Sequence, residues 1–108
     1  MRFLSPFVLF PASGGAQSGY SVTGPGSTDY EGDYPETGTN NSRPAYRLDS
    51  THWLYHVAVG GEFDYWGLGA SKGSEDLAYY VSSSAATPPL SGWQVGIGNI
   101  PEPTLSEL

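Results

Sequence analysis

The stretch HWLYHVAVGGEFDYWGLG, residues 52–69, contains two aromatic-rich segments joined by a pair of glycines. Valine, tyrosine and tryptophan favour strands because their side chains pack well on a pleated, half-buried surface. Gly60-Gly61 indicates a two-residue hairpin turn, since such turns need residues that tolerate positive φ angles. We therefore predict a strand over 52–59, a tight turn, and a second strand over 62–69 that pairs back on the first.

Both faces of this predicted hairpin carry large side chains. Successive side chains of a strand point to opposite faces of the sheet. On the first strand, Trp53, Tyr55 and Val57 share one face and Leu54, His56 and Ala58 the other. On the second strand, Phe63, Tyr65 and Gly67 share one face and Glu62, Asp64, Trp66 and Leu68 the other. We expect the core to take one set, and the other set to be partly exposed or covered by a long loop.

The flanking sequence extends the strand pattern in both directions. Further strands are predicted over 19–24, 45–48, 77–81 and 92–98, with one short strand near 33–34 inside a long polar stretch. The 15 glycines and 9 prolines disfavour long helices. The chain of 108 residues has the size of one small domain. We predict one loop-rich, all-β domain over 19–98, with five to seven short antiparallel strands in a sandwich-like or barrel-like arrangement.

The two ends of the chain are predicted to lie outside this domain. Residues 1–18 begin with a single Arg, continue with an apolar run over 3–10 and end in small residues. This order is typical of a secretory signal peptide, and the alternative is a disordered leader, because Pro6 and Pro11 weaken a helix. The apolar run is shorter than the roughly 20 residues that a membrane-spanning helix needs. Residues 99–108 are predicted to be a Pro-containing tail or linker.

Charge and composition limit the partners of the protein. Eleven Asp and Glu against four Lys and Arg give a formal net charge of −7, which would repel nucleic acid and anionic membrane surfaces. The absence of Cys excludes disulfides and Cys-based zinc sites. Asn40-Asn41-Ser42 is a glycosylation-type triplet, so Asn40 is a candidate acceptor if the chain is secreted. We expect an extracellular protein whose partner is carbohydrate or another protein.

Several motifs occur in an order that resembles a known but essentially uncharacterised module. The segments are GDYPETGTNNSRPAY (32–46), HWLYH, YWGLG, AYYV and ATPPLSGWQ. They resemble a small β module, G-x-Y … N-G-R-P-x-Y … W-L-Y … W-x-[IL]-G … P-P-x-x-G-W, which recurs, often in tandem, in large proteins of microbial eukaryotes and some marine invertebrates. The matching positions are Gly32, Tyr34, Gly38, Asn41, Arg43, Pro44, Tyr46, Trp53, Leu54, Tyr55, Trp66, Leu68, Gly69, Pro88, Pro89, Gly92 and Trp93.

The resemblance covers residues 19–98 and implies an accessory β module, usually part of something larger, with no activity to transfer. This chain has Ser42 where the pattern usually has Gly. If that Gly supplies a positive φ angle, the turn in this chain must be built differently.

The sequence contains no strong catalytic or metal-binding motif. His52 and His56 are four residues apart on a predicted strand, about 13 Å, which is too far for both to bind one zinc ion. An acidic run, Asp29, Glu31, Asp33 and Glu36, lacks the downstream Glu of a calcium loop. Neither a nucleophile elbow nor a phosphate-binding loop is present. We therefore predict no metal, no cofactor and no enzymatic activity, and keep a small enzyme as the remote alternative.

Aromatic side chains are the best candidates for ligand binding. The three Trp residues are core residues, or one of them, with Tyr79 or Tyr80, forms an exposed platform of the kind that packs against the apolar C–H face of a sugar. Arg43 has one of two predicted roles. Either it stabilises the fold, by an ion pair or by stacking on an aromatic ring such as Tyr46, or it binds an anionic ligand. The candidate ligand-binding residues are Arg43, Tyr46, Trp66, Tyr79, Tyr80 and Trp93. We predict a non-catalytic binding or structural module that recognises carbohydrate through an aromatic face, with a protein–protein assembly or adhesion unit as the alternative.

Overall fold

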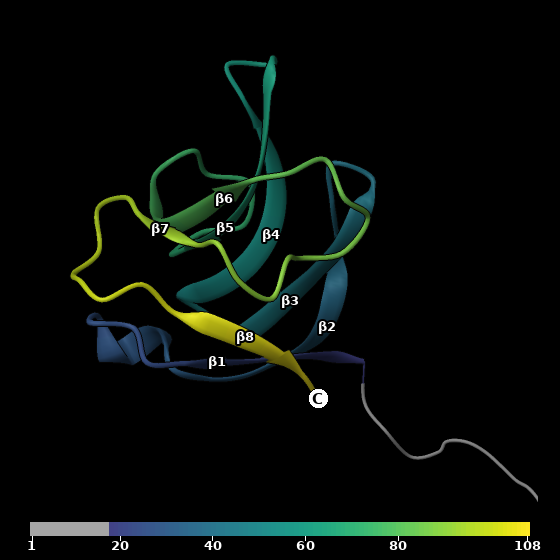
Figure 1. Ribbon diagram of the computed structural model, residues 1–108. Coiled ribbons are helices and arrows are strands. Elements are labelled where there is room, and N and C mark those ends of the chain that lie inside the picture. The colour runs from purple at the N-terminus through teal and green to yellow at the C-terminus, as the bar shows by residue number, and fades with distance from the viewer. Residues whose placement is uncertain (1–17) are drawn as a thin grey trace, which may run out of the picture.

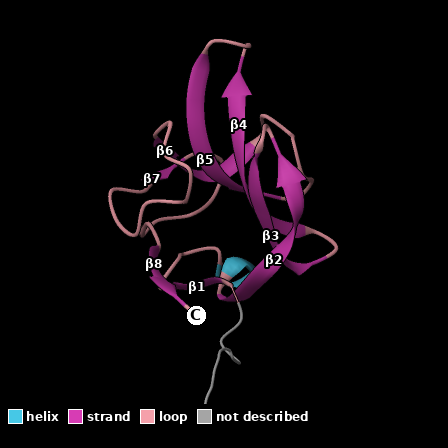
Figure 2. Ribbon diagram, turned by 90° about the vertical axis from the view of Figure 1, so that its right-hand side faces the viewer, coloured by secondary structure: helices cyan, strands magenta, loops and turns pink. Residues whose placement is uncertain are grey.

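The computed structural model describes residues 18–108, and nearly all regular structure in them is β (Figures 1 and 2). The elements are β1 (Gly19–Thr23), η1 (Thr28–Tyr30, a 3₁₀ turn), β2 (Gly32–Asn40), β3 (Arg43–Asp49), β4 (His52–Val59), β5 (Phe63–Gly69), β6 (Leu77–Ser82), β7 (Gln94–Val95) and β8 (Thr104–Glu107). They form one antiparallel sheet in the order β7-β6-β5-β4-β3-β2-β1-β8, curled into a half-barrel. This confirms the predicted small, all-β, barrel-like domain, with eight strands instead of five to seven. The predicted leader lies outside the described residues, apart from Ser18.

The central hairpin follows the prediction closely. In the β4–β5 register, Leu54 faces Leu68 and His56 faces Trp66 on one side of the sheet, while Val57 faces Tyr65 on the other. The predicted two-residue turn is wrong by one residue, because Val59 pairs with Phe63. Gly60 and Gly61 both have positive φ, and the Glu62 amide donates to the Val59 carbonyl at 3.2 Å, so Glu62 is an extra residue after the turn.

The polar stretch before this hairpin contains more strand than its composition indicates. β2 runs over nine residues where a short strand was predicted, and it pairs with β1 through its first half and with β3 through its second half. Tyr34 is buried in the first half of the strand and anchors it to the core. The Gly and Pro residues that suggested loops lie within this strand, where Gly38 has a positive φ angle next to a register shift.

The C-terminal residues are part of the sheet. The predicted tail or linker over 99–108 contains β8, which pairs antiparallel with β1 and inserts Leu105 into the core. The prolines at 101 and 103 precede the strand and leave its amides free to pair. The strand predicted over 92–98 is reduced to β7, because the amides of residues 96–98 bond irregularly to the carbonyls of Leu77 and Ala78.

The inner face of the half-barrel holds the main hydrophobic core. Its buried members are Tyr20, Val22, Tyr34, Tyr46, Leu54, Trp66, Leu68, Ala78, Tyr79, Trp93 and Leu105. The segment 83–93 crosses this face. The Trp66 indole donates to the Ala85 carbonyl at 3.0 Å, and the Leu105 amide donates to the Leu90 carbonyl at 3.0 Å. The core is therefore closed by irregular chain and not by a second sheet.

The outer face of β4, β5 and β6 carries a second, smaller cluster. Its buried members are Ala45, Tyr55, Val57 and Leu77, and the partly buried Trp53, Val59, Tyr65 and Tyr80 pack against them. The loop 70–76 is fastened to this face because the Tyr55 hydroxyl donates to the Ser74 carbonyl at 2.8 Å. The outer face thus has a short loop as its cover, and large side chains remain accessible beside it.

Candidate binding site on the outer face

Four of the predicted ligand-binding residues lie in the core. The exposed fractions are 2% for Tyr46, 0% for Trp66, 0% for Tyr79 and 5% for Trp93. Their polar atoms also have partners in the chain: the Trp93 indole donates to the Pro89 carbonyl at 2.9 Å, and the Tyr79 hydroxyl donates to the Asn99 carbonyl at 2.6 Å. The structure does not bring these rings together on a surface.

Arg43 and Asn40 are used to hold the fold together. The Arg43 guanidinium donates to the carbonyls of Ser84 and Ala85, at 2.7 and 3.0 Å, and so fastens the start of β3 to the segment 83–93. The Asn40 side-chain amide, the candidate glycosylation site, donates to the His56 carbonyl at 2.7 Å.

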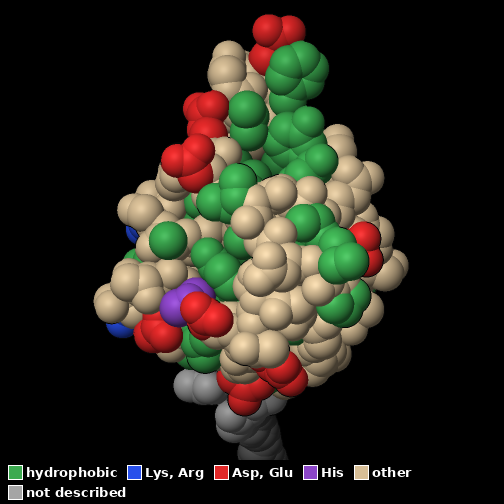
Figure 3. All heavy atoms as spheres, turned by 90° about the vertical axis from the view of Figure 1, so that its left-hand side faces the viewer, with side chains coloured by type: hydrophobic (Ala, Val, Ile, Leu, Met, Phe, Trp, Pro, Cys, Tyr) green, Lys and Arg blue, Asp and Glu red, His purple; other side chains and the backbone are tan. Residues whose placement is uncertain are grey.

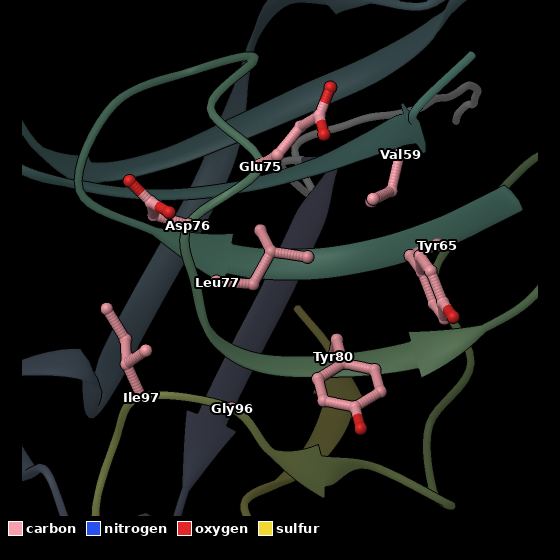
Figure 4. A pocket seen from close by; sticks show the side chains of 8 residues that line it. All are labelled: Val59, Tyr65, Glu75, Asp76, Leu77, Tyr80, Gly96 and Ile97. Carbon is pink, nitrogen blue, oxygen red and sulfur yellow. The ribbon is translucent and has the colours of Figure 1, made fainter. Parts of the chain in front are cut away.

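Tyr80, the remaining candidate, lines an open pocket on the outer face. This tyrosine pocket has a volume of about 270 Å³ and is lined by Val59, Tyr65, Glu75, Asp76, Leu77, Tyr80, Gly96 and Ile97. The rings of Tyr65 and Tyr80 meet edge to face, with 5.3 Å between centroids and an interplanar angle of 83°. Figure 4 shows the two tyrosines on the neighbouring strands β5 and β6, and the two carboxylates on the loop that leads into β6.

Glycine and backbone hydrogen bonds shape the pocket. Gly67 pairs with Tyr80, and a Cβ atom on Gly67 would lie 2.5 Å from a methyl carbon of Leu77, so the absence of a side chain there lets Leu77 form the floor. The Ile97 amide donates to the Leu77 carbonyl at 3.0 Å, which places Ile97 at the edge. The Glu75 carboxylate accepts from the Gly60 amide at 3.3 Å and links the rim to the hairpin turn.

Hydrophobic side chains continue from this pocket along the projecting hairpin. Figure 3 shows them gathered over the upper part of the molecule, with acidic side chains beside them. Phe63, the first residue of β5, is 58% exposed, and Ile97 is 77% exposed. Two other hollows, near η1 and near the end of β8, have more polar linings. The tyrosine pocket therefore offers the most apolar concave surface of the three.

The two histidines occupy separate sites with separate partners. His56 is buried and neutral: the Asn41 amide donates to its Nδ1 at 2.8 Å, and its Nε2 donates to the Ser83 carbonyl at 3.0 Å. Burial lowers the pKa of His56, an effect that the Ser83 carbonyl partly opposes. His52 Nδ1 lies 2.7 Å from Asp49, and this hydrogen bond lowers the pKa of the Asp49 carboxyl. Over residues 18–108, no group of three or more His, Asp or Glu side chains is placed to hold a metal ion.

Comparison of the chain with protein-family models, with curated proteins and with solved structures finds no match. In the part of the chain that the structure describes, no helix has the length and apolar character needed to cross a membrane.

Sequence reasoning missed most of the tyrosine pocket. Tyr65 was not chosen as a candidate, because both faces of the predicted hairpin carry aromatic residues. Glu75, Asp76 and Ile97 lie in segments without periodicity, and only the fold brings them to Tyr80. The signal that was available is the alternation of Val57, Tyr65 and Phe63 on the face opposite to Trp66.

Proposed function

We propose that this chain is a non-catalytic, extracellular binding module that recognises carbohydrate through the tyrosine pocket. The observation that carries the proposal is the pair Tyr65 and Tyr80, half-buried and edge to face, beside a cavity whose rim holds two exposed carboxylates. Aromatic edges and faces with a few polar groups nearby are the usual lining of small-ligand sites.

The chemistry of the pocket matches that of a sugar ring. A sugar presents apolar C–H groups on its faces and hydroxyls around its edge. Tyr65, Tyr80 and Leu77 supply apolar surface, and the carboxylates of Glu75 and Asp76 supply hydrogen-bond acceptors for hydroxyl groups. The volume of about 270 Å³ is just below the range of roughly 300–1,000 Å³ for drug-sized ligands, so the pocket suits one ring of a saccharide.

A glycan-array screen of the full chain and of two variants tests this proposal. Tyr80→Ala should weaken binding of any hit by about tenfold or more. Removing an aromatic ring from the centre of a binding site costs roughly 1.4 kcal/mol or more, and about 1.4 kcal/mol is a factor of ten in Kd. Phe63→Ser is the matched control, since Phe63 is an exposed aromatic residue on the same hairpin but outside the pocket. Equal loss of binding in both variants, or hits that Tyr80→Ala leaves unchanged, would refute the pocket as the sugar site.

A second candidate function, a protein–protein assembly or adhesion unit, is favoured by the hairpin itself. The β4–β5 turn projects from the body of the molecule (Figure 1), and Phe63, the first residue of β5 after this turn, is 58% exposed. Exposed apolar side chains grouped in this way mark interfaces in many proteins. Light scattering distinguishes the two functions: assembly through the hairpin gives a mass above that of the monomer, and Phe63→Ser, but not Tyr80→Ala, returns it to the monomer.

A further inference from the structure

A second group of side chains lies on the outer face, on the other side of the loop 70–76. The Arg47 guanidinium carbon lies 5.3 Å from the centroid of the Trp53 ring, and the Lys72 ammonium lies 5.4 Å from the same centroid. Arg47 and Trp53 are directly paired across β3 and β4, while Lys72 comes from the loop. We call Arg47, Trp53 and Lys72 the cation cluster.

The two cations of this cluster have no anionic partner among residues 18–108. The ion pairs of the described chain all involve a histidine, His52 or His56. Arg43, the third basic side chain in this range, donates hydrogen bonds to backbone carbonyls. The side chains of Arg47 and Lys72, in contrast, form no hydrogen bond with residues 18–108. Although the chain has 11 acidic side chains, the two cations beside this indole ring pair with none of those in the described range.

Both cations lie within cation–π range of the same indole ring. Lys and Arg groups within about 6 Å of a Trp ring are attracted by the negative face of its π system. An added Cβ atom on Gly38 would lie 3.5 Å from the Lys72 ammonium, which places the end of the Lys72 side chain beside β2. The indole ring thus helps to position both positive groups before a ligand binds.

We propose that the cation cluster is a binding site for an oxyanion, a sulphate or a carboxylate group. A planar guanidinium matches the oxygens of such a group in a bidentate manner, and an ammonium adds a point charge beside it. The cation cluster shares no residue with the tyrosine pocket, so the two proposals can be tested independently.

Quenching of tryptophan fluorescence in the full chain tests this site. Trp53 is half-buried and the other two tryptophans are buried, so Trp53 is the residue that ionic quenchers reach most easily. A net charge of −7 should repel iodide and attract caesium. The proposal predicts the reverse: the iodide-to-caesium ratio of quenching constants should be at least about twofold higher for the chain than for free N-acetyltryptophanamide, which corrects for the intrinsic efficiency of each ion.

Variants show whether the two named cations cause this preference. Arg47→Gln with Lys72→Gln should abolish it, and Lys72→Arg should keep it. A control with Ser91→Glu and Ser106→Glu changes the net charge by the same amount at exposed positions outside the cluster, and it should also keep the preference. If the control loses the preference as the Gln variant does, the effect comes from net charge and the site is refuted.

Competition then separates a binding site from a merely positive surface. Sodium sulphate, sodium glucuronate and a sulphated disaccharide are added at constant ionic strength, with sodium chloride as the reference. Saturable protection of Trp53 from iodide is expected, and it supports the proposal in either of two forms. Tighter protection by the disaccharide identifies a group on a saccharide as the preferred ligand, while equal protection by free sulphate identifies the free ion. Protection no greater than that by chloride would overturn the proposal.

Discussion

The inner and outer faces of the sheet carry similar side chains in different states. On the inner face, Trp66 and Tyr79 are fully buried and their polar atoms bond to the chain. On the outer face, Tyr65 and Tyr80 are half-buried beside an open pocket. The difference comes from the cover: the inner face lies under the segment 83–93 and the curl of the sheet, and the outer face lies under the short loop 70–76. Aromatic content therefore does not identify the core in this protein, whereas the covering segment does.

The largest expected effect comes from shortening a side chain on the inner face. Trp66→Ala should lower the free energy of unfolding by about 3–5 kcal/mol, because it opens a cavity and leaves the Ala85 carbonyl without its donor. Tyr80→Ala on the outer face should cost about 1 kcal/mol, since this ring is already partly in water. Urea unfolding measures both values. If Trp66→Ala does not fold, Trp66→Phe should still lose more stability than Tyr80→Ala, and equal losses would contradict the comparison.

A smaller effect is expected where the outer face is closely packed. Gly67→Ala should destabilise the fold by about 1–3 kcal/mol, since the new methyl group would lie 2.5 Å from Leu77. Adding Leu77→Ala removes the clashing methyl groups, so the double variant should lose less stability than the sum of the two single variants. Strict additivity in urea unfolding would show that the two residues do not compete for this space.

The pH dependence of stability should reveal the buried histidine of the inner face. Burial lowers the pKa of His56 in the folded chain, so below the unfolded value of about 6.5 the unfolded chain binds more protons. Stability should therefore fall as the pH decreases from about 6.5 towards the lowered folded value, by at most about 1.4 kcal/mol per pH unit. Urea midpoints at pH 7.5 and pH 5.5 measure the loss. The His52→Gln variant should show the same loss. If the loss disappears in that variant, it comes from His52 and not from His56.

The smallest effect concerns the turn that joins β2 and β3. Asn41 and Ser42 have φ angles of 51° and 63°, so Ser42 takes the left-handed conformation that glycine adopts without strain. Ser42→Gly should raise the stability by about 0.5–1 kcal/mol, seen as an increase in melting temperature. Ser82→Gly in β6 should lower it, because glycine weakens a strand. A lower melting temperature for Ser42→Gly would mean that the Ser42 side chain contributes more than its backbone conformation costs.

The same turn shows what could be predicted from the sequence. We expected a differently built turn only if a Gly at position 42 supplies a positive φ angle; Ser42 itself has a positive φ, so a serine does not prevent this conformation. The all-β class and the β4–β5 pairing could be predicted, because alternation and a glycine turn are local signals. β8 and the second half of β2 could not, because their residues are polar or rich in Pro, and they become strands only where β1 and β3 offer free backbone groups.

The candidate sites were less predictable than the fold. Tyr80 was named as a ligand-binding candidate, but Tyr65 and Ile97 join it only through the pairing of β5 with β6 and the irregular bonds of residues 96–98. The cation cluster likewise needs the loop 70–76 to fold back over β4, which brings Lys72 to Trp53. Charge counting alone classified this chain as acidic and gave no sign of a local positive site.

The most direct test of the division between the two faces is an NMR titration of the full chain with the best ligand from the glycan array. Aromatic and methyl resonances distinguish the tyrosine pocket, Tyr65, Leu77, Tyr80 and Ile97, from the inner core, Leu54, Trp66 and Trp93. Our account predicts saturable shifts confined to the pocket and unchanged Trp66 and Trp93 resonances. Shifts centred on the tryptophans of the inner face, with the pocket unchanged, would contradict it.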